Sequence, residues 1–485
     1  MLARATTHAL VGLEPRRVEV EAHLPGGLPG FTIVGLADRA CQEAKERVRS
    51  GIASAELSWP KGRVIVNLAP AGLRKEGSAF DLSIALAILA ASGQVDPTVL
   101  AEHAVFGEVA LDGRIRPVGG VLAVAEGARK LGLERLLCPA AVSPEAALAG
   151  IEAIPLRHLA EAVCYLRGDG RPPPYIPPNG HRPVSPAPDL ADVRGQERAR
   201  RALELAAAGR HNLLLAGPPG TGKTMLGRRL PGILPKLGRE EALEVTRIHS
   251  VAGVLPRDHV LIEAPPFRAP HHSASAAAIV GGGPGPRPGE ASLAHRGVLL
   301  LDEFPEFQRP VLEALRQPLE DGTICIARAT GQAVFPARFQ LVATMNLCPC
   351  GGRADPAAEC SCSAQQLARF RAKLSHALLD RFDLVVTVPR PRAEELSAGP
   401  SEGSSEVRAR VDSARIRLDA GPLPRTGEAD ALLDRAVERL PLSARGRARV
   451  ARVAATAAAL AGGEQVSGEH VAEALAYRSP RELTS

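Results

Sequence analysis

Aromatic residues are scarce in this 485-residue chain, which holds 1 Trp, 3 Tyr and 10 Phe and is 3% aromatic. Proteins that hold single-stranded nucleic acid on base-stacking platforms need more of them. Any contact with nucleic acid is therefore expected to be directed mainly at phosphates. Long apolar runs are also missing, since the longest largely apolar stretch, residues 82–91, is too short to span a bilayer. The sequence thus excludes a membrane-spanning protein.

A secretion signal and a strong charge excess are missing as well. The N-terminus has no unbroken apolar segment and no small-residue cleavage site, so we expect a cytoplasmic protein without disulfides. The net charge of +6 permits a polyanionic partner without requiring one. At roughly 150 residues per domain, the length predicts about three domains.

Proline-rich residues 169–188 form the clearest boundary along the chain. Dense Pro without apolar periodicity predicts an extended, semi-rigid linker. Residues 1–168 combine strand-like alternation with helical spacing, which predicts an α+β domain. Residues 189–390 alternate helices and strands as a parallel α/β core does. Residues 391–485 show helical spacing alone, which predicts an all-α lid.

The expected elements fall within these boundaries. Strands are expected at residues 18–24, 63–70, 211–216, 298–301 and 339–344. Helices are expected at residues 37–55, 81–92, 196–208, 223–230, 407–418, 429–440, 443–461 and 467–477. Together they predict a multidomain α/β protein.

A glycine-rich run, GPPGTGKT at 217–224, lies between an expected strand and an expected helix. In that context the pattern binds phosphate: its glycines let backbone N–H groups converge on a β-phosphate. Lys223 would neutralise phosphate oxygens and Thr224 would ligate Mg²⁺. A glycine-rich turn without a ligand is the alternative. The expected nucleotide-binding residues are Gly217, Pro218, Pro219, Gly220, Thr221, Gly222, Lys223, Thr224 and Asp302.

A matching acidic strand follows at 298–303, where VLLLDE places two carboxylates after four apolar residues. Asp302 would hold Mg²⁺, and Glu303 would polarise the attacking water as a general base. The agreement between the glycine-rich run and this strand predicts nucleotide hydrolysis.

Three further polar residues fit a site around a γ-phosphate. Asn346 follows an apolar strand and would orient the attacking water. Arg381 lies far along the chain from the glycine-rich loop, which favours an arginine finger supplied to a neighbouring subunit. Arg445 opens a helix of the lid and would reach back to the phosphates and couple the lid to the nucleotide state. Taken singly, each has an alternative: a solvated arginine, or an asparagine that caps a strand end.

Several runs of this chain resemble one known family. They are DVRGQERARRALELAAAGRHNLLLAGPPGTGKT, FRAPHHSAS, PGEASLAHRGVLLLDEFPEF and NLCPCG. They are similar to the ComM and YifB family of magnesium-chelatase-like AAA+ ATPases, and the resemblance covers essentially the whole chain. It implies ATP and Mg²⁺ as ligands, a homo-oligomeric ring, expected to be a hexamer, and a helicase that drives branch migration of DNA during integration of transforming DNA and homologous recombination.

The same resemblance assigns roles to the polar residues. By motif, Lys223 belongs to Walker A and Glu303 to Walker B. Asn346 matches sensor 1, Arg381 the finger that acts on a neighbour, and Arg445 sensor 2.

Two insertions of the resembling family project toward the pore of its ring. Here they correspond to the glycine- and proline-rich residues 281–289 and to a hairpin at 324–335. The candidate DNA-facing residues are His271, His272, Arg287 and Arg328, each of which offers charge or donors to phosphates. For the two histidines, capping a helix or pairing with carboxylates is an equal alternative.

Four of the eight cysteines cluster as CPC, nine residues and CSC. Thiolates in a reducing compartment suit tetrahedral Zn²⁺, although this spacing is tighter than in common zinc sites. We expect a structural zinc site; free thiols or a redox pair are the alternatives. The ligands would be Cys348, Cys350, Cys360 and Cys362. The remaining four are interpreted as packing residues: Cys41, Cys138, Cys164 and Cys325.

Residues 1–168 resemble a Lon-type protease domain, through RKEGSAFDLSIALAIL and FGEVALDGRIRPVGGVLAVAEGARKLG. That fold uses a Ser activated by a Lys of lowered pKa. Ser78 lies near the nucleophile position, where a gapless alignment places Ala79, and Leu122 stands at the Lys position. The domain is therefore predicted to be inactive as a protease and to serve interaction or assembly. Lys75 and Ser78 are interpreted as a turn and a helix cap.

Two other functions stay open from the sequence. The AAA+ module is similar to the small magnesium-chelatase subunit, a motor for metal insertion into a porphyrin. About 190 residues precede the GQE segment at which chelatase motors begin, which favours the DNA-acting relatives. A remodelling ATPase that ignores DNA is the other alternative.

Overall fold

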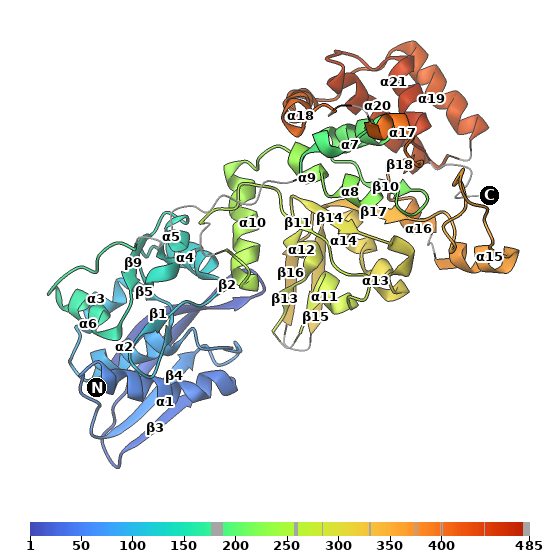
Figure 1. Ribbon diagram of the computed structural model, residues 1–485. Coiled ribbons are helices and arrows are strands. Elements are labelled where there is room, and N and C mark those ends of the chain that lie inside the picture. Colours follow the sequence, from blue (N-terminus) through green and yellow to red (C-terminus); the bar gives the residue numbers. More distant parts are fainter. Residues whose placement is uncertain are drawn as a thin grey trace.

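The structure is a computed structural model in which three units follow one another along the chain (Figure 1). It describes residues 1–478, apart from 176–187, 257–259, 284, 329–330, 374–375, 398, 400 and 441. Most of the linker expected at 169–188 lies outside the described residues. Within them, no helix is both long and apolar enough to cross a membrane.

The N-terminal unit is built on a mixed sheet of order β3-β4-β2-β1-β5-β8-β9. The strands of this unit are β1 (Leu2–Val11), β2 (Glu14–His23), β3 (Gly30–Val34), β4 (Arg63–Ala69), β5 (His103–Val105), β6 (Glu108–Val109), β7 (Ile115–Arg116), β8 (Arg135–Pro139) and β9 (Glu152–Leu156). β1 and β2 form an antiparallel hairpin, whereas β5, β8 and β9 run parallel to β1 or to one another.

Helices cover this sheet, and one of them is entirely buried. The helices are α1 (Arg39–Ser54), α2 (Asp81–Ala91), α3 (Pro97–Ala101), α4 (Val121–Lys130), α5 (Ser143–Ala147) and α6 (Leu159–Arg167). Every residue of α2 is buried, because all of them except Asp81 and Ser83 are apolar, as suits a helix enclosed on every side. The buried Asp81 forms an ion pair of 2.7 Å with Arg47. It packs against β1, β2 and α1 and so forms the centre of the N-terminal core.

The central unit holds a five-stranded parallel sheet of order β11-β14-β17-β10-β18. Its strands are β10 (Leu213–Ala216), β11 (Phe267–Arg268), β14 (Val298–Leu301), β17 (Gln340–Met345) and β18 (Leu384–Thr387). Two small antiparallel hairpins stand apart from it: β12 (Gly281–Gly282) with β13 (Arg287–Pro288), and β15 (Thr323–Arg328) with β16 (Gly331–Pro336). Both sheets together confirm the expected multidomain α/β class.

The helices of the central unit differ from expectation in one place. They are α7 (Glu197–Gly209), α8 (Lys223–Gly227), α9 (Leu230–Ile233), α10 (Arg239–Ala252), α11 (Ala276–Val280), α12 (Glu290–Leu293), α13 (Arg309–Ala314), α14 (Arg316–Asp321), α15 (Ala364–Lys373) and α16 (His376–Leu379). The single helix expected over 223–230 ends at Gly227, and a new one begins at Leu230. Pro231 explains the break, because its ring would clash with the carbonyl of residue 227 in a continuous helix.

The last unit is helical and shares a core with the central one. Its helices are α17 (Ala393–Ser397), α18 (Ser404–Asp419), α19 (Gly427–Arg439), α20 (Ala444–Leu460) and α21 (Gly468–Ala476). Buried residues of α18 and α20 pack with α7 in one cluster, which extends to β10 and β18. The last unit therefore packs on α7, which in turn packs on β10 and β18.

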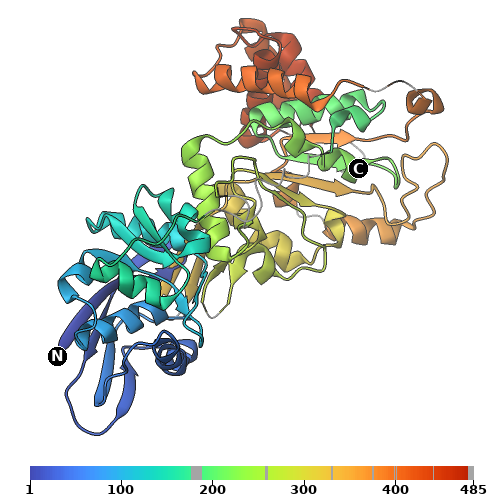
Figure 2. The same ribbon diagram turned by 60° about the vertical axis from the view of Figure 1, so that its left-hand side comes forward.

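The N-terminal unit contacts the central one through α10 and the β15–β16 hairpin (Figures 1 and 2). Leu13, in the turn between β1 and β2, belongs to a buried apolar cluster with Phe335 of the hairpin and Ile248 of α10. Beside it, Arg247 of α10 forms an ion pair of 3.0 Å with Glu126. The apolar cluster links the N-terminal unit to the β15–β16 hairpin, which is expected to face the pore.

Candidate nucleotide-binding site

The glycine-rich loop follows β10 at the carboxyl end of the parallel sheet and leads into α8. Gly220 and Gly222 have φ of 74° and 87°, a left-handed backbone that glycine adopts without cost. At Gly217 a Cβ atom would lie 2.2 Å from the Val388 carbonyl oxygen. Because no side chain fits there, the loop needs glycine at this point in order to pass β18.

Lys223 lies buried beneath this loop. Its Nζ donates to the carbonyl oxygens of Gly217 at 2.9 Å and Pro218 at 2.6 Å. Burial lowers the pKa of Lys223, and the nearby carboxylates Asp302 and Glu303 oppose that shift. A lysine that neighbouring carbonyls hold in a loop of this conformation fits a phosphate-binding role.

The acidic residues after β14 lie directly across from α8. Asp302 Oδ1 accepts hydrogen bonds from Thr224 Oγ1 at 2.7 Å and Thr344 Oγ1 at 2.6 Å. A carboxylate and a hydroxyl side by side are hard oxygen ligands of the kind that Mg²⁺ prefers. The pair therefore fits the metal expected of it.

Glu303 is held in an uncommon backbone conformation. Its φ is 54°, in the left-handed region that non-glycine residues seldom adopt. The Glu303 N–H donates to Thr344 Oγ1 at 3.0 Å, so one threonine hydroxyl links both acidic residues. Backbone conformations of this kind persist where neighbouring contacts fix them, and they gather at functional sites.

Thr344 was not among the residues expected at the site. It is 2% exposed, and the sequence shows it only as the polar end of an apolar strand. The register of β14 with β17, in which Leu301 pairs with Ala343, brings it next to Asp302. One signal in the sequence could have indicated Thr344 as a site residue. It lies near the carboxyl end of an expected parallel strand, two residues before Asn346.

These residues surround a cavity of about 360 Å³. Asn346 lines it, so the structure brings Asn346 together with the glycine-rich loop and both acidic residues. The lining residues are Pro219, Gly220, Lys223, Thr224, Asp302, Glu303, Pro305, Glu306, Thr344, Met345, Asn346, Cys348, Pro349 and Phe370. A cavity with a glycine-rich loop and a lysine on one side and two carboxylates on the other suits hydrolysis of a phosphate chain.

Arg381 and Arg445 do not line this cavity, and both approach the carboxylate of Glu320. Arg381 is hydrogen-bonded to Glu320, and Arg445 approaches the same carboxylate at 3.6 Å. The Arg381 side chain is 12% exposed and that of Arg445 is 74% exposed. Burial lowers the pKa of Arg381, and the charges of Arg445 and Arg316 lower it further.

Arg381 and Glu320 line a second cavity, of about 570 Å³, in which basic side chains outnumber acidic ones. Among its other lining residues are Asn212, Gln340 and Asp383, which lie at the amino ends of β10, β17 and β18. The first cavity lies at the opposite, carboxyl ends of the parallel strands, after β10, β14 and β17. The two arginines thus lie near the amino ends of the parallel strands, whereas the glycine-rich loop of the same chain lies at the carboxyl ends.

The expected DNA-facing residues lie on three different segments of the central unit. His271 accepts from the Ser273 N–H at 3.3 Å and lies 2.8 Å from its hydroxyl, as in a turn cap. His272 Nδ1 lies 3.8 Å from Glu303 Oε2, so His272 makes the carboxylate contact named as an alternative. His271 contacts a turn residue before α11, whose N-cap is Ser275. Arg287 is exposed on β13. Arg328 ends β15, and its side chain lies outside the described part of the chain.

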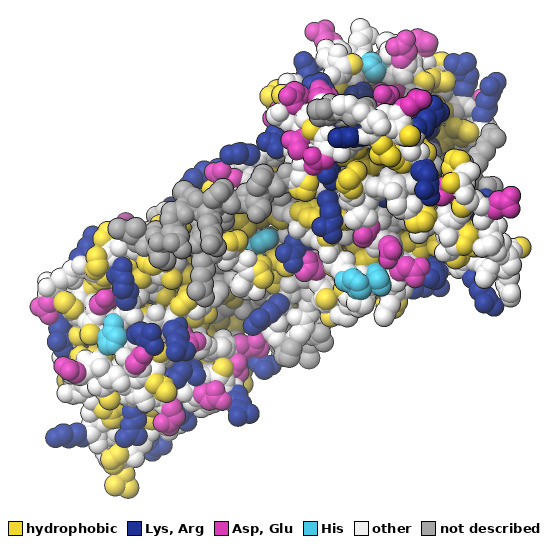
Figure 3. Space-filling model, viewed as in Figure 1, with side chains coloured by type: hydrophobic (Ala, Val, Ile, Leu, Met, Phe, Trp, Pro, Cys, Tyr) yellow, Lys and Arg dark blue, Asp and Glu magenta, His cyan; other side chains and the backbone are white. Residues whose placement is uncertain are grey.

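On the side seen in Figure 3, Lys and Arg are interspersed with Asp and Glu over all units. This face therefore shows no continuous basic patch among the residues that are coloured there.

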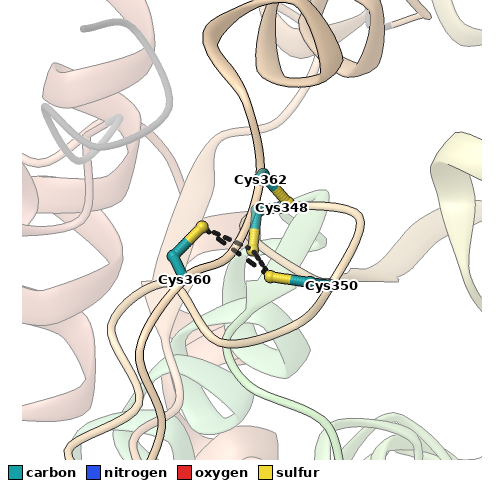
Figure 4. Close-up of side chains that lie close together, drawn as sticks. All are labelled: Cys348, Cys350, Cys360 and Cys362. Carbon is teal, nitrogen blue, oxygen red and sulfur yellow. Dashed lines mark hydrogen bonds between the residues drawn. The ribbon is translucent and has the colours of Figure 1, made fainter.

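The four clustered cysteines converge in the loop after β17 (Figure 4). Their Sγ atoms all lie within 4.8 Å of one another. Cys348 Sγ is 3.4 Å from that of Cys350 and 3.6 Å from that of Cys360. The Arg353 N–H also donates to Cys348 Sγ at 3.3 Å. Four thiols gathered around one point fit a tetrahedral Zn²⁺ ion.

Leu122, which the sequence comparison places at the position of the protease lysine, lies fully buried in α4. Its N–H donates to Glu145 at 3.2 Å, and Glu145 also accepts from the Ser250 hydroxyl of α10. Ser78 donates to Glu108 and does not cap α2, whose first turn is preceded by Phe80. The helix cap expected of Ser78 is therefore wrong.

Comparison with known proteins places these features in a family. Residues 189–396 match the model described as magnesium chelatase, subunit ChlI; residues 20–142 match subunit ChlI of Mg-chelatase; and residues 421–478 match magnesium chelatase, subunit ChlI C-terminal. The chain is 47% identical over 498 residues to an uncharacterized protein of Mycobacterium tuberculosis, covering 98% of each.

Two further relatives match over nearly their whole length. The chain is 42% identical over 503 residues to the competence protein ComM of Haemophilus influenzae, covering 99% of this chain and 97% of that protein. It is 41% identical over 498 residues to the protein YifB of Escherichia coli, covering 98% of this chain and 96% of that protein.

Proposed function

The chain belongs to the magnesium-chelatase ChlI family that includes ComM and YifB, and on that premise we propose that it is a ring-forming, Mg²⁺-dependent ATPase that moves branched or double-stranded DNA. The observation that carries the ATPase part is the cavity at the carboxyl ends of β10, β14 and β17, where the anion-binding loop faces two carboxylates. The DNA part rests on the kinship with a competence protein.

Each polar residue of the cavity has a distinct task in hydrolysis. The glycine-rich loop and Lys223 bind the β- and γ-phosphates. Thr224 and Asp302 would hold Mg²⁺, which when bound neutralises charge on the phosphate oxygens. Glu303 accepts a proton from the attacking water, and Asn346 orients that water.

The ATP site is shared between subunits in this proposal. Arg381 and Arg445 lie at the sheet edge opposite their own glycine-rich loop, where they share Glu320. Contacts in a ring of identical chains are head-to-tail. The amino ends of the strands in one subunit can therefore face the carboxyl ends of the strands in the next. We therefore assign both arginines to the γ-phosphate of a neighbour, in a ring expected to be hexameric.

DNA is expected to meet the ring along the two hairpins of the central unit. Arg287 is exposed on β13 and Arg328 ends β15. His271 and His272 lie beside the nucleotide site, since His272 faces Glu303. A DNA contact made by these histidines would therefore act close to the general base. The N-terminal unit packs against the second hairpin through Leu13, and we infer that it supports this hairpin rather than cleaving peptides.

A structural Zn²⁺ at the four cysteines completes the proposal. It requires reduced thiols and therefore agrees with a cytoplasmic location. The donor set, four sulfurs within 4.8 Å of one another, is the observation in its support.

A chelatase-like motor is the second candidate, because the matched family models describe a magnesium-chelatase subunit. The matches to ComM and YifB extend over nearly the full length of this chain and therefore include the N-terminal unit. Because one of these relatives is a competence protein, the shared unit favours the DNA motor.

ATP hydrolysis by the purified full-length chain, with and without forked DNA, separates these candidates. Lys223→Ala serves as the control for contaminating activity. We expect DNA to stimulate hydrolysis and added salt to weaken the stimulation, since phosphate contacts release counterions. Robust hydrolysis that does not respond to DNA would contradict the DNA motor and favour a chelatase-like or remodelling ATPase.

A further inference from the structure

The loop that carries the four clustered cysteines, residues 346–363, forms one wall of the nucleotide cavity and is called the cysteine loop below. Cys348 and Pro349, at its start, line that cavity together with Lys223 and Asp302. Cys348 is fully buried, so one of the four sulfur ligands is part of the cavity wall. The loop and the nucleotide site are therefore in direct contact.

A second contact joins the loop to the glycine-rich loop itself. Gly351 has a φ of 79°, and a Cβ atom placed there would lie 2.8 Å from Cδ and 2.9 Å from Cγ of Pro219. The backbone between Cys350 and Cys360 thus presses against the proline that precedes Gly220. A shift of the cysteine loop would remove the support on this side of the phosphate-binding turn.

A third contact fixes the far side of the loop. Asp355 accepts a hydrogen bond of 2.8 Å from Arg390, and its side chain is 3% exposed. Arg390 follows β18 two residues after Val388, whose carbonyl oxygen adjoins Gly217. The loop is therefore also joined to the segment after β18, which adjoins Gly217 at the start of the glycine-rich loop.

The loop has little else to hold it in place. Residues 346–363 contain no helix or strand, and residues 356–361 are all exposed. Ordering such a segment costs conformational entropy at every residue. A metal ion bound by four thiolates supplies the missing free energy, because metal binding in small sites is coupled to folding of the segment that holds the ligands.

We propose that a single Zn²⁺ ion held by Cys348, Cys350, Cys360 and Cys362 fixes the cysteine loop against Pro219 and thereby sets the affinity of the cavity for nucleotide. The inference rests on the proposed ATPase function and adds to it a dependence on metal. Loss of the ion leaves Lys223, Asp302 and Glu303 in the chain but releases the wall that supports the phosphate-binding turn.

The size of the effect follows from the fraction of chains with an ordered loop. If the metal-free loop takes the pocket-forming arrangement in roughly one chain in ten, the apparent Kd rises about tenfold. We expect that rise for a fluorescent mant-ADP probe in the presence of Mg²⁺.

The test uses the full-length protein in three forms. Metal content is measured by mass spectrometry, and mant-ADP affinity is measured for the wild type, for wild type stripped of metal and returned to buffer, and for the same sample after Zn²⁺ is restored. The double variant Cys360→Ser with Cys362→Ser removes two ligands. Its matched control, Cys164→Ser with Cys325→Ser, removes two thiols that lie outside the cluster.

We expect about one zinc per chain in the wild type and in the control pair, weaker mant-ADP binding in the stripped protein and the ligand variant, and recovery of the stripped protein on adding Zn²⁺. If the ligand variant does not fold, stripping and restoring the wild type still decides the question. A wild type without bound zinc, or a stripped protein with unchanged Kd, overturns the inference while leaving the ATPase intact. Zinc-loaded wild type that fails to bind mant-ADP at all overturns the proposed function as well.

Discussion

Replacing Thr344 by valine tests how the two acidic residues are positioned. The Thr344 hydroxyl donates to Asp302 at 2.6 Å and accepts from the Glu303 N–H at 3.0 Å. Thr344→Val keeps the shape of the side chain but removes both hydrogen bonds. The Glu303 N–H then has no acceptor there, and its left-handed backbone, at a φ of 54°, loses a stabilising contact.

The magnitude follows from the two bonds. Each hydrogen bond contributes about 1 kcal/mol, so the variant loses about 2 kcal/mol of the free energy that holds Asp302 and Glu303 in place. If the activation free energy rises by that amount, kcat falls roughly thirtyfold. Nucleotide affinity should change much less, because Lys223 and the glycine-rich loop remain unchanged. The expected result is therefore a low kcat with a nearly normal Kd for mant-ADP.

The assay is steady-state ATP hydrolysis paired with mant-ADP titration, and Thr344→Ser is the matched control because it retains the hydroxyl. We expect Thr344→Ser to keep most of the activity. A Thr344→Val protein that hydrolyses ATP within about twofold of the wild type would refute the positioning role.

Three further predictions concern charge and assembly. Lys223→Ala should lose nucleotide affinity, whereas Glu303→Gln should bind ATP but hardly hydrolyse it; normal turnover by Glu303→Gln would show that another group is the base. Glu303→Gln and Arg381→Ala chains should each be inactive alone, but a mixture should recover activity at about a quarter of its sites, where an intact glutamate meets an intact neighbouring arginine; an arginine acting within its own chain would give no recovery. Burial lowers the pKa of His211, which contacts Thr456 of the lid at 2.8 Å, to about 4. Because the unfolded histidine is protonated below about pH 6.5, stability is lost as the pH falls from there toward 4, by about 2 kcal/mol at pH 5; the wild-type Tm should therefore fall more between pH 7 and pH 5 than that of His211→Asn, and equal falls would contradict this.

The glycine-rich loop could be predicted from the sequence because its parts are adjacent in the chain. Residues 217–224 carry the backbone donors, the lysine and the threonine in one run. Asp302 could be placed by its motif, since it follows an apolar strand in the order expected of a parallel sheet. In both cases the local pattern and the sheet geometry lead to the same site.

Contacts between distant segments could not be predicted in the same way. Thr344 meets Asp302 only because β14 and β17 pair in one register, which no local pattern encodes. Glu320 meets Arg381 from 61 residues away. The contact of Gly351 with Pro219 likewise depends on the path of an irregular loop. These contacts require the assembled fold.

Branch migration of a synthetic four-way DNA junction tests the central claim most directly. Labelled junctions are incubated with the wild type and ATP, with the wild type and no nucleotide, and with Glu303→Gln and ATP. The account predicts conversion of junctions into duplex products by the wild type with ATP alone. Junctions left intact by a wild type that hydrolyses ATP, or converted equally well by Glu303→Gln, would contradict a DNA motor driven by this site.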